Sequence, residues 1–242
     1  MSELTRQARV HVLIPAAGRG KRYGGDVLKQ YLPICGKAVM AHSIRAFQFH
    51  PLISGITVIL AKDDKLFESA VGHLAKVVET VTGGDTRAES VRNGLEFVAD
   101  KYPAVDWVLI HDAARPCLSP ELLDQLLEVG MQSDDGAILA TPVADTLKRA
   151  GDANQIIETV DRCDLWAAQT PQLFRLHALI KAIDAAHAEG VELTDEASAM
   201  EFVGGKPKLV VGSSVNIKIT HPGDMAIAEA WLGCNRPGNR QS

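Results

Sequence analysis

Short, continuously apolar segments recur along the chain, and stretches with helical periodicity separate them. Such segments are typical of strands covered on both faces, and strands that alternate with helices form mostly parallel sheets. The sequence therefore predicts an α/β fold with a doubly wound, mostly parallel sheet. The expected strands are Val10–Ile14, Ile56–Leu60, Val77–Val81, Trp107–Ile110, Ala137–Ala140, Leu209–Val211 and Asn216–Ile219.

Three helix starts carry capping signals. Thr86 and Glu89 form a capping box ahead of an apolar stripe, and Ser119 is a cap followed by proline at the first helical position. The sequence Thr194-Asp195-Glu196 places acidic groups at the positive end of a third helix. Each signal predicts where a helix between two strands begins.

Residues 144–160 interrupt this alternation with mixed polar and apolar residues and no helical stripe, with Gly151-Asp152 near the middle. This pattern predicts a long hairpin between two core strands. It is either an ordinary surface hairpin or, because a hairpin outside a core is only marginally stable, one that packs on a second subunit. We expect one domain over residues 1–232, with the hairpin at about 141–163, and a flexible tail over 233–242.

The charge balance excludes some functions. With 25 Lys and Arg against 30 Asp and Glu, the net charge is −5, which argues against a general binder of nucleic acid or of anionic membranes. The first nine residues lack the apolar core of a signal peptide, and no apolar run approaches the roughly 18 residues of a membrane span. The four cysteines, Cys35, Cys117, Cys163 and Cys234, form no C-x-x-C pair. We therefore expect a soluble cytoplasmic protein with reduced thiols.

A glycine-rich loop, residues 15–25, follows the first expected strand. Such a loop is either a tight turn or a phosphate-binding loop, because its backbone N–H groups can face an anion. Tyr23 replaces the third glycine of the dinucleotide motif, and no Lys-Ser/Thr pair completes a Walker motif. The cations Lys21, Arg22 and Lys29 follow within a short distance. They form either a solvated basic loop or a clamp for a triphosphate.

Asp112 lies just after the expected strand Trp107–Ile110, where open α/β sheets bind ligands. A carboxylate there suits Mg²⁺, which takes one or two protein carboxylates and completes its shell with phosphate and water. The alternative is a turn in which the aspartate pairs with Arg115. We expect His111 to be structural, because no nucleophile accompanies it.

Two further sites each allow two interpretations. Gly84 and Asp85 form either a turn or a backbone edge for a nucleobase, and Lys218 is either an exposed strand residue or a functional cation; Arg162 ends the hairpin. No H-E-x-x-H, G-x-S-x-G or Cys/His pairing supports zinc hydrolysis or serine acyl transfer.

Nine short motifs, spread over about residues 10 to 232, together resemble the 2-C-methyl-D-erythritol 4-phosphate cytidylyltransferase family. The glycine loop alone would indicate only a nucleotidyltransferase, whereas HDAARP, TDEASA and NIK in one chain are far more specific. The motifs are Pro15-Ala16-Ala17-Gly18-x-Gly20-x-Arg22, Lys29-Gln30-Tyr31, Gly84-Asp85-x-Arg87-x-x-Ser90-Val91, His111-Asp112-Ala113-Ala114-Arg115-Pro116, Asp145-Thr146, Thr159-Val160-Asp161-Arg162, Thr170-Pro171-Gln172, Thr194-Asp195-Glu196-Ala197-Ser198 and Asn216-Ile217-Lys218.

The resemblance implies a Rossmann-like sheet of the nucleotide-diphospho-sugar transferase type with a protruding β-hairpin arm. It implies an enzyme that transfers CMP from CTP to 2-C-methyl-D-erythritol 4-phosphate, giving 4-diphosphocytidyl-2-C-methyl-D-erythritol and pyrophosphate, a step of the non-mevalonate isoprenoid pathway. It also implies Mg²⁺ as the cofactor and a homodimer whose arm reaches over the partner.

Residue roles follow from the same resemblance. Arg22 and Lys29 would stabilise the transition state at the α-phosphate, while Arg162 and Lys218 would position the acceptor phosphate. Asp112 would hold Mg²⁺. The CTP site would be lined by Ala16, Ala17, Gly18, Gly84, Asp85 and Ser90, and substrate would also meet Asp112, Arg115, Thr146 and Thr194.

The chain departs from the family pattern at two positions in the first loop. Leu28 replaces the usual proline before Lys29, and Tyr23 stands where methionine is common. Loss of proline frees the loop backbone without moving the charge of Lys29. Two rival functions remain at this point: a cytidylyltransferase for another polyol phosphate, such as ribitol 5-phosphate, and a non-catalytic nucleotide-binding module.

Overall fold

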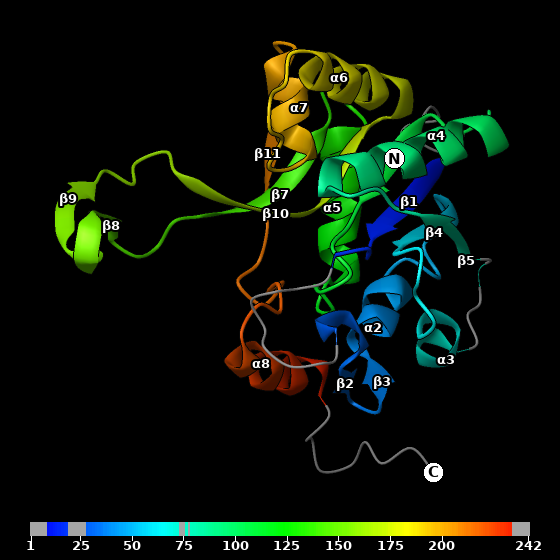
Figure 1. The fold of residues 1–242 in the computed structure, drawn as a ribbon, viewed down its shortest axis with the longest axis horizontal. Coiled ribbons are helices and arrows are strands. Elements are labelled where there is room, and N and C mark those ends of the chain that lie inside the picture. The colour runs from blue at the N-terminus through cyan, green and yellow to red at the C-terminus, as the bar shows by residue number, and fades with distance from the viewer. Residues whose placement is uncertain (1–8, 19–27, 73–75, 77, 234–242) are drawn as a thin grey trace.

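The computed structural model describes residues 9–18, 28–72, 76 and 78–233, and a seven-stranded sheet forms its centre (Figure 1). The strand order is β11-β7-β10-β6-β1-β4-β5. Neighbouring strands are parallel, except that β10 runs antiparallel to both β6 and β7. The expected doubly wound, mostly parallel sheet is therefore confirmed. Its strands are β1 (Val10–Pro15), β4 (Ile53–Leu60), β5 (Val78–Thr82), β6 (Trp107–Ile110), β7 (Ala137–Pro142), β10 (Trp166–Arg175) and β11 (Lys208–Val211).

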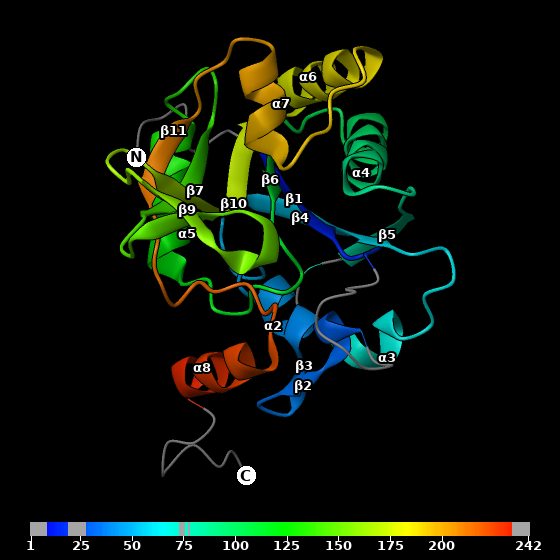
Figure 2. The same ribbon diagram turned by 60° about the vertical axis from the view of Figure 1, so that its left-hand side comes forward.

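Helices cover both faces of this sheet (Figures 1 and 2). The helices α4 (Arg87–Lys101), α6 (Leu176–Ala188) and α7 (Glu196–Phe202) lie on one face, and α2 (Val39–Arg45), α3 (Phe67–Val71) and α5 (Pro120–Gly130) lie on the other. Consecutive residues of β1 feed opposite cores, since Leu13 packs with the α4 side and Val12 with the α5 side. Burial on both faces explains why this strand reads as a continuous apolar run.

The three predicted helix starts are confirmed. The Thr86 and Glu89 side chains form the capping box of α4, and the Ser119 hydroxyl accepts a hydrogen bond from the backbone N–H of Leu122 at the start of α5. Asp195 caps α7. These caps depend on groups within one helical turn, which is why local sequence predicts them.

The expected strand Asn216–Ile219 is wrong, because this segment forms no strand. Instead, its backbone is held by isolated hydrogen bonds: the Asn216 carbonyl accepts from Arg115 Nη1 at 2.6 Å, and the Ile219 N–H donates to the Ala114 carbonyl at 2.8 Å. The segment thus contacts the loop after β6 rather than a sheet edge. The sequence reading also omitted β10, the antiparallel strand between β6 and β7.

The expected hairpin is present and projects from the body of the molecule (Figure 1). It pairs β8 (Leu147–Ala150) with β9 (Ile156–Val160), and a short 3-10 helix, η2 (Asp152–Asn154), forms its tip. Ile156 and Ile157 are 66% and 65% exposed. The hairpin therefore carries large apolar side chains that this chain leaves uncovered.

A small group of elements lies beside the α2 and α3 end of the sheet (Figure 2). It holds the 3-10 helix η1 (Lys29–Tyr31), the strands β2 (Pro33–Ile34) and β3 (Lys37–Ala38), and the helix α8 (Pro222–Leu232), which packs on β2. Cys35 in this group is disulfide-bonded, whereas Cys117 and Cys163 are free. The expectation that all four thiols are reduced is therefore wrong for Cys35. Among the described helices, none is long and apolar enough to cross a membrane.

Candidate active site

A pocket of about 260 Å³ opens at the carboxyl ends of β1, β5 and β6. From β1 the chain adds β4 and β5 on one side and then returns to place β6 on the other side of β1. Such a switch point is where open α/β sheets bind ligands. The lining residues are Pro15, Ala16, Ala17, Gly18, Lys29, Gln30, Gly84, Asp85, Thr86, Arg87, Ser90, Asp112, Ala113, Ala114 and Lys218.

The first wall of the pocket is the chain that leaves β1. The Ala16 N–H donates to the Ile59 carbonyl at 2.8 Å, and the Gln30 side-chain amide donates to the Ala16 carbonyl at 3.0 Å. These bonds fix the start of the glycine-rich loop against β4 and η1. Gly18 is exposed, and a Cβ built on it would meet no described atom within 4 Å, so the backbone there is open to a ligand.

The second wall is the loop before α4, and Ser90 shapes it from below. The Ser90 hydroxyl accepts from the Gly84 N–H at 3.1 Å and donates to the Thr86 carbonyl at 2.8 Å. A Cβ on Gly84 would lie 2.5 Å from the Cβ of Glu89, so only glycine fits there. The spacing between Gly84 and Ser90 therefore reflects a loop fixed by the first turn of its own helix.

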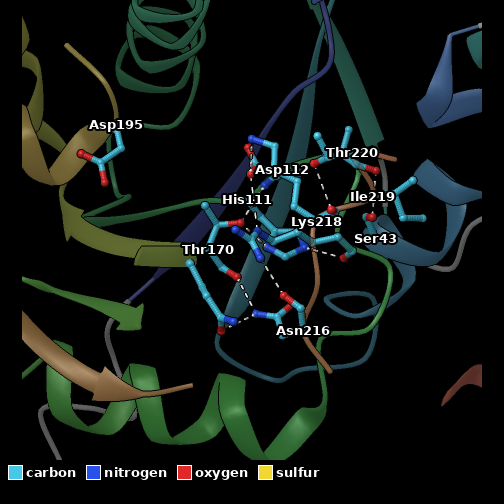
Figure 3. Close-up of polar contacts among 12 residues, drawn as sticks. Ser43, His111, Asp112, Thr170, Asp195, Asn216, Lys218, Ile219 and Thr220 are labelled. Atoms are coloured by element: carbon cyan, nitrogen blue, oxygen red, sulfur yellow. Dashed lines mark hydrogen bonds and ion pairs between the residues drawn. The ribbon is translucent and has the colours of Figure 1, made fainter. Parts of the chain in front are cut away.

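Asp112 lies among three cations, and one of them, Lys218, is labelled beside it in Figure 3. Its carboxylate is 2.9 Å from Lys218 Nζ, 3.5 Å from Arg115 Nε and 3.8 Å from Arg87 Nη2. Burial opposes ionisation of this carboxyl, but Lys218, Arg87 and Arg115 hold its pKa well below the usual range. Asp112 is therefore a carboxylate at every pH at which the protein would work.

His111 is fully buried and both of its ring nitrogens are engaged. Its Nε2 lies 3.0 Å from the Arg115 carbonyl, and its Nδ1 lies 3.2 Å from the Thr170 hydroxyl, which also accepts the Asp112 N–H at 3.0 Å. These partners suit a neutral ring with its proton on Nε2. Burial lowers the pKa of His111 to about 4. The ring stabilises the turn around Asp112 and cannot serve as a general base at neutral pH.

The segment 216–220 carries a lysine to the pocket and receives another from η1. Lys29 Nζ donates to the Ile219 carbonyl at 2.8 Å. Asn216, which is fully buried, donates its side-chain amide to the Thr170 carbonyl at 2.9 Å, and this bond anchors the segment that bears Lys218 (Figure 3). Both lysines therefore face one pocket although they are far apart in the sequence.

Known proteins resemble this chain in sequence over almost its whole length. The family model described as 2-C-methyl-D-erythritol 4-phosphate cytidylyltransferase matches residues 10–234. The chain belongs to this family. A cytidylyltransferase of that name from Xanthomonas campestris is 50% identical over 223 residues, which is 92% of this chain and 84% of that protein.

Solved structures of cytidylyltransferases have a similar fold. The crystal structure of a 4-diphosphocytidyl-2C-methyl-D-erythritol synthase has a TM-score of 0.82 and 40% identity, over 93% of this chain and 99% of that one. The Francisella tularensis 2-C-methyl-D-erythritol 4-phosphate cytidylyltransferase has a TM-score of 0.80 and 36% identity, over 93% of this chain and 100% of that one.

The structure brings together most of the residues expected from the cytidylyltransferase motifs. Arg115 points behind the pocket toward Asn216, as in the turn with Asp112 considered above, and Thr194 is exposed just ahead of α7. Thr146 and Arg162 are exposed at the two roots of the arm, away from this chain's own pocket lining. Arg22 lies outside the described residues. The expected residues in the lining are Ala16, Ala17, Gly18, Lys29, Gly84, Asp85, Ser90, Asp112 and Lys218.

Leu28, the departure from the cytidylyltransferase pattern, has φ −64° and ψ 130°. A proline would impose almost the same φ. Its carbonyl accepts the Tyr31 N–H at 2.9 Å and so starts η1. Leu28 therefore adopts the geometry that proline would fix, and Lys29 keeps its place at the pocket.

Three residues at or beside the pocket belong to the motifs but have no role in the predictions above. Arg87 and Gln30 line the pocket, and Glu196, 3% exposed, pairs with Arg87 from α7. The available signal was position: Arg87 is the first residue of a capped helix that follows a glycine loop. Nothing local indicated that Glu196 would reach it.

Asp112 can provide one oxygen ligand to a metal ion. Its Oδ2 is occupied by Lys218 and Arg115, whereas its Oδ1 has the longer contact with Arg87. In the described part of the chain, no three His, Cys, Asp or Glu residues gather as a metal site. Mg²⁺ often binds through one carboxylate with phosphate and water. The residues therefore fit a magnesium ion that arrives with a nucleotide triphosphate.

Proposed function

We propose that this pocket transfers CMP from CTP to 2-C-methyl-D-erythritol 4-phosphate and releases pyrophosphate. The observation that supports it most directly is the cation group around one ionised, buried carboxylate at the switch point of the sheet. Glycine and alanine backbone on one side suits a nucleotide, and lysines from two segments suit phosphates. Membership of the cytidylyltransferase family supports the choice of substrates.

The acceptor needs no protein base. A phosphate monoester has a second pKa near about 6, so it is already largely an anionic nucleophile at neutral pH. One of its oxygens attacks the α-phosphorus of CTP; a new P–O bond forms, the bond to the bridging oxygen breaks, and pyrophosphate leaves. The engagement of both His111 nitrogens is consistent with such a reaction.

The remaining work is to bring two polyanions together and to stabilise the charge that develops between them. Lys29 and Lys218, which both line the pocket, provide fixed positive charge. Asp112 holds Lys218 in place through the 2.9 Å ion pair. Fixed cations that face developing charge commonly contribute a factor of about 10² to 10³ in kcat. Arg22 is proposed to add to them.

Asp112 Oδ1 is the group proposed to hold Mg²⁺, for the reason given above. When bound, the metal offsets the charge of the triphosphate and helps to orient it. The protein's own part is to keep this oxygen ionised and directed at the pocket, which its cation neighbours do.

We further propose a cytoplasmic homodimer in which each arm completes the partner's pocket. Thr146 and Arg162 lie at the roots of the arm and are exposed, and Ile156 and Ile157 on β9 are uncovered. A second copy packed against the arm would cover these isoleucines and bring Arg162 to an acceptor phosphate. The acidic composition supports the proposal of no nucleic-acid partner.

The acceptor is tested by turnover with CTP and either methylerythritol phosphate or ribitol 5-phosphate at equal concentration. We expect the higher kcat/KM with methylerythritol phosphate. Faster reaction with ribitol 5-phosphate would move the protein to the rival specificity. CTP binding without turnover of either acceptor would favour the non-catalytic module.

A further inference from the structure

One buried ion pair connects a wall of the pocket to the start of α7. Arg87, the first residue of α4, and Glu196, the first residue of α7, make a two-pronged contact: Nη1 lies 2.5 Å from Oε1 and Nη2 lies 3.1 Å from Oε2. Such fork geometry fixes the orientation of the guanidinium as well as its position. Glu196 is 3% exposed, whereas the Arg87 side chain is 35% exposed and lines the pocket.

Arg87 stands between two carboxylates. Its Nη2, which binds Glu196, is also 3.8 Å from Oδ1 of Asp112. Glu196 therefore competes with Asp112 for the same guanidinium. As a result, the short contact of Asp112 is the one between its Oδ2 and Lys218 Nζ, and its Oδ1 has only the 3.8 Å contact with Arg87 Nη2.

Each partner begins a helix that carries a capping box. The Thr86–Glu89 box holds Asp85, whose N–H donates to Glu89 Oε2 at 2.8 Å. The Asp195–Ser198 box precedes α7. The ion pair thus joins the nucleotide wall of the pocket to the loop that contains Thr194.

We propose that Glu196 is a positioning residue for cytidylyl transfer: it holds Arg87 at the pocket wall and away from a full ion pair with Asp112. This inference rests on the proposed function. Without the Glu196 charge, the guanidinium moves toward Asp112 Oδ1 and loosens the Asp112–Lys218 contact. The predicted defect lies in the reaction step rather than in the occupancy of the pocket.

The test is Glu196→Gln, which preserves the size of the side chain and removes its charge. We expect kcat to fall about 10-fold or more, the range found when a supporting partner of a site ligand is lost. The stoichiometry of CTP binding, measured by titration calorimetry, should remain that of the unmodified protein, which a general folding defect would not allow.

The matched control is Asp184→Asn. Asp184 on α6 makes a similar two-pronged pair with Arg92, which lies on α4 like Arg87, at 2.6 and 3.2 Å. Neither Asp184 nor Arg92 lines the pocket. We expect its kcat to stay within about twofold of the unmodified protein, as exposed pairs contribute little.

A third variant guards against misfolding of Glu196→Gln. Arg87→Lys keeps the charge and loses the fork, so it should also lower kcat with CTP binding retained. Adding Glu196→Gln to Arg87→Lys should cost much less than Glu196→Gln alone, because residues that act through one another are not additive.

The proposal is overturned if Glu196→Gln keeps kcat within twofold, or if its loss of kcat equals a loss of CTP-binding sites. It is also overturned if Asp184→Asn or the added substitution in Arg87→Lys costs as much as Glu196→Gln alone. These outcomes differ from failure of the proposed function, in which the unmodified protein itself does not turn over CTP with methylerythritol phosphate.

Discussion

Lys29 links the first loop to the segment that carries Lys218, since its ammonium group donates to the Ile219 carbonyl across the pocket edge. Replacement by alanine removes a cation that faces the reacting phosphates while leaving the backbone walls in place. We expect Lys29→Ala to lower kcat by about 10² to 10³ while CTP still binds. Steady-state kinetics and calorimetric titration of CTP check both parts.

The control for this variant is Lys37→Ala, at an exposed residue of β3 that lies outside the pocket lining. It should leave kcat unchanged. Full activity of Lys29→Ala would remove Lys29 from the catalytic group.

At the scale of elements, the capping box of α4 has two duties. Thr86 stabilises the helix and also lines the pocket, whereas Ser119 caps α5 and does not. Thr86→Ala and Ser119→Ala should each lower the free energy of unfolding by about 1 kcal/mol, as loss of an N-cap usually does. Only Thr86→Ala should also raise the KM for CTP, because Thr86 itself lines the pocket.

Denaturant unfolding and CTP kinetics on the two variants separate these duties. A KM for CTP that rises equally in Thr86→Ala and Ser119→Ala would mean that Thr86 has no specific part in the CTP site.

Elements whose signals are local could be predicted from the sequence. The caps at Thr86, Ser119 and Asp195 depend on neighbours within one turn, and β1 and β6 are buried on both faces. The segment 216–219 looks like a strand because it carries the β-branched residues Ile217 and Ile219. Its partners are instead Arg115 and Ala114, about a hundred residues earlier. Apolar composition reports burial and does not report which neighbour provides it.

The same distinction divides the site. Residues after β1, β5 and β6 could be placed together, because the carboxyl ends of parallel strands share one edge. The Arg87–Glu196 pair could not, since it joins residues 109 positions apart. The predicted roles of Thr146 and Arg162 depend on a second copy of the chain, which one sequence does not position.

Across the whole molecule, two buried histidines tie stability to pH. Burial lowers the pKa of His11 and of His111 to about 4 each. Both are neutral in the folded protein and take up a proton on unfolding below about 6.5, so the unfolded state binds more protons between pH 6.5 and 4. Stability is therefore full above pH 6.5 and falls as the pH drops, by roughly 3 kcal/mol for each histidine at the low end.

Urea unfolding at pH 7, 6, 5 and 4.5 measures this slope. His11→Gln should flatten it by about one proton. A slope that is flat in the unmodified protein would contradict the buried neutral state of both rings.

The proposed shared site makes a prediction for mixtures of inactive chains. Lys29→Ala damages the body of the site, and Arg162→Ala damages the arm. In a mixed dimer, one pocket carries both defects and the other carries neither. After unfolding and refolding a 1:1 mixture, about a quarter of the sites should be intact, and activity should return in proportion.

No recovery, with mixed dimers verified by mass spectrometry, would show that the arm serves its own chain. A monomer by light scattering at the working concentration would remove the shared site altogether.

The pocket at the carboxyl ends of β1, β5 and β6 is proposed to join CMP to 2-C-methyl-D-erythritol 4-phosphate. Pyrophosphate release by the unmodified protein tests it most directly, with CTP and 2-C-methyl-D-erythritol 4-phosphate supplied together, each omitted in turn, and ATP, GTP or UTP substituted for CTP. We predict one pyrophosphate for each acceptor consumed, only when both substrates are present, and with CTP strongly preferred. Absence of pyrophosphate under these conditions, or release that does not depend on the acceptor, would contradict the account.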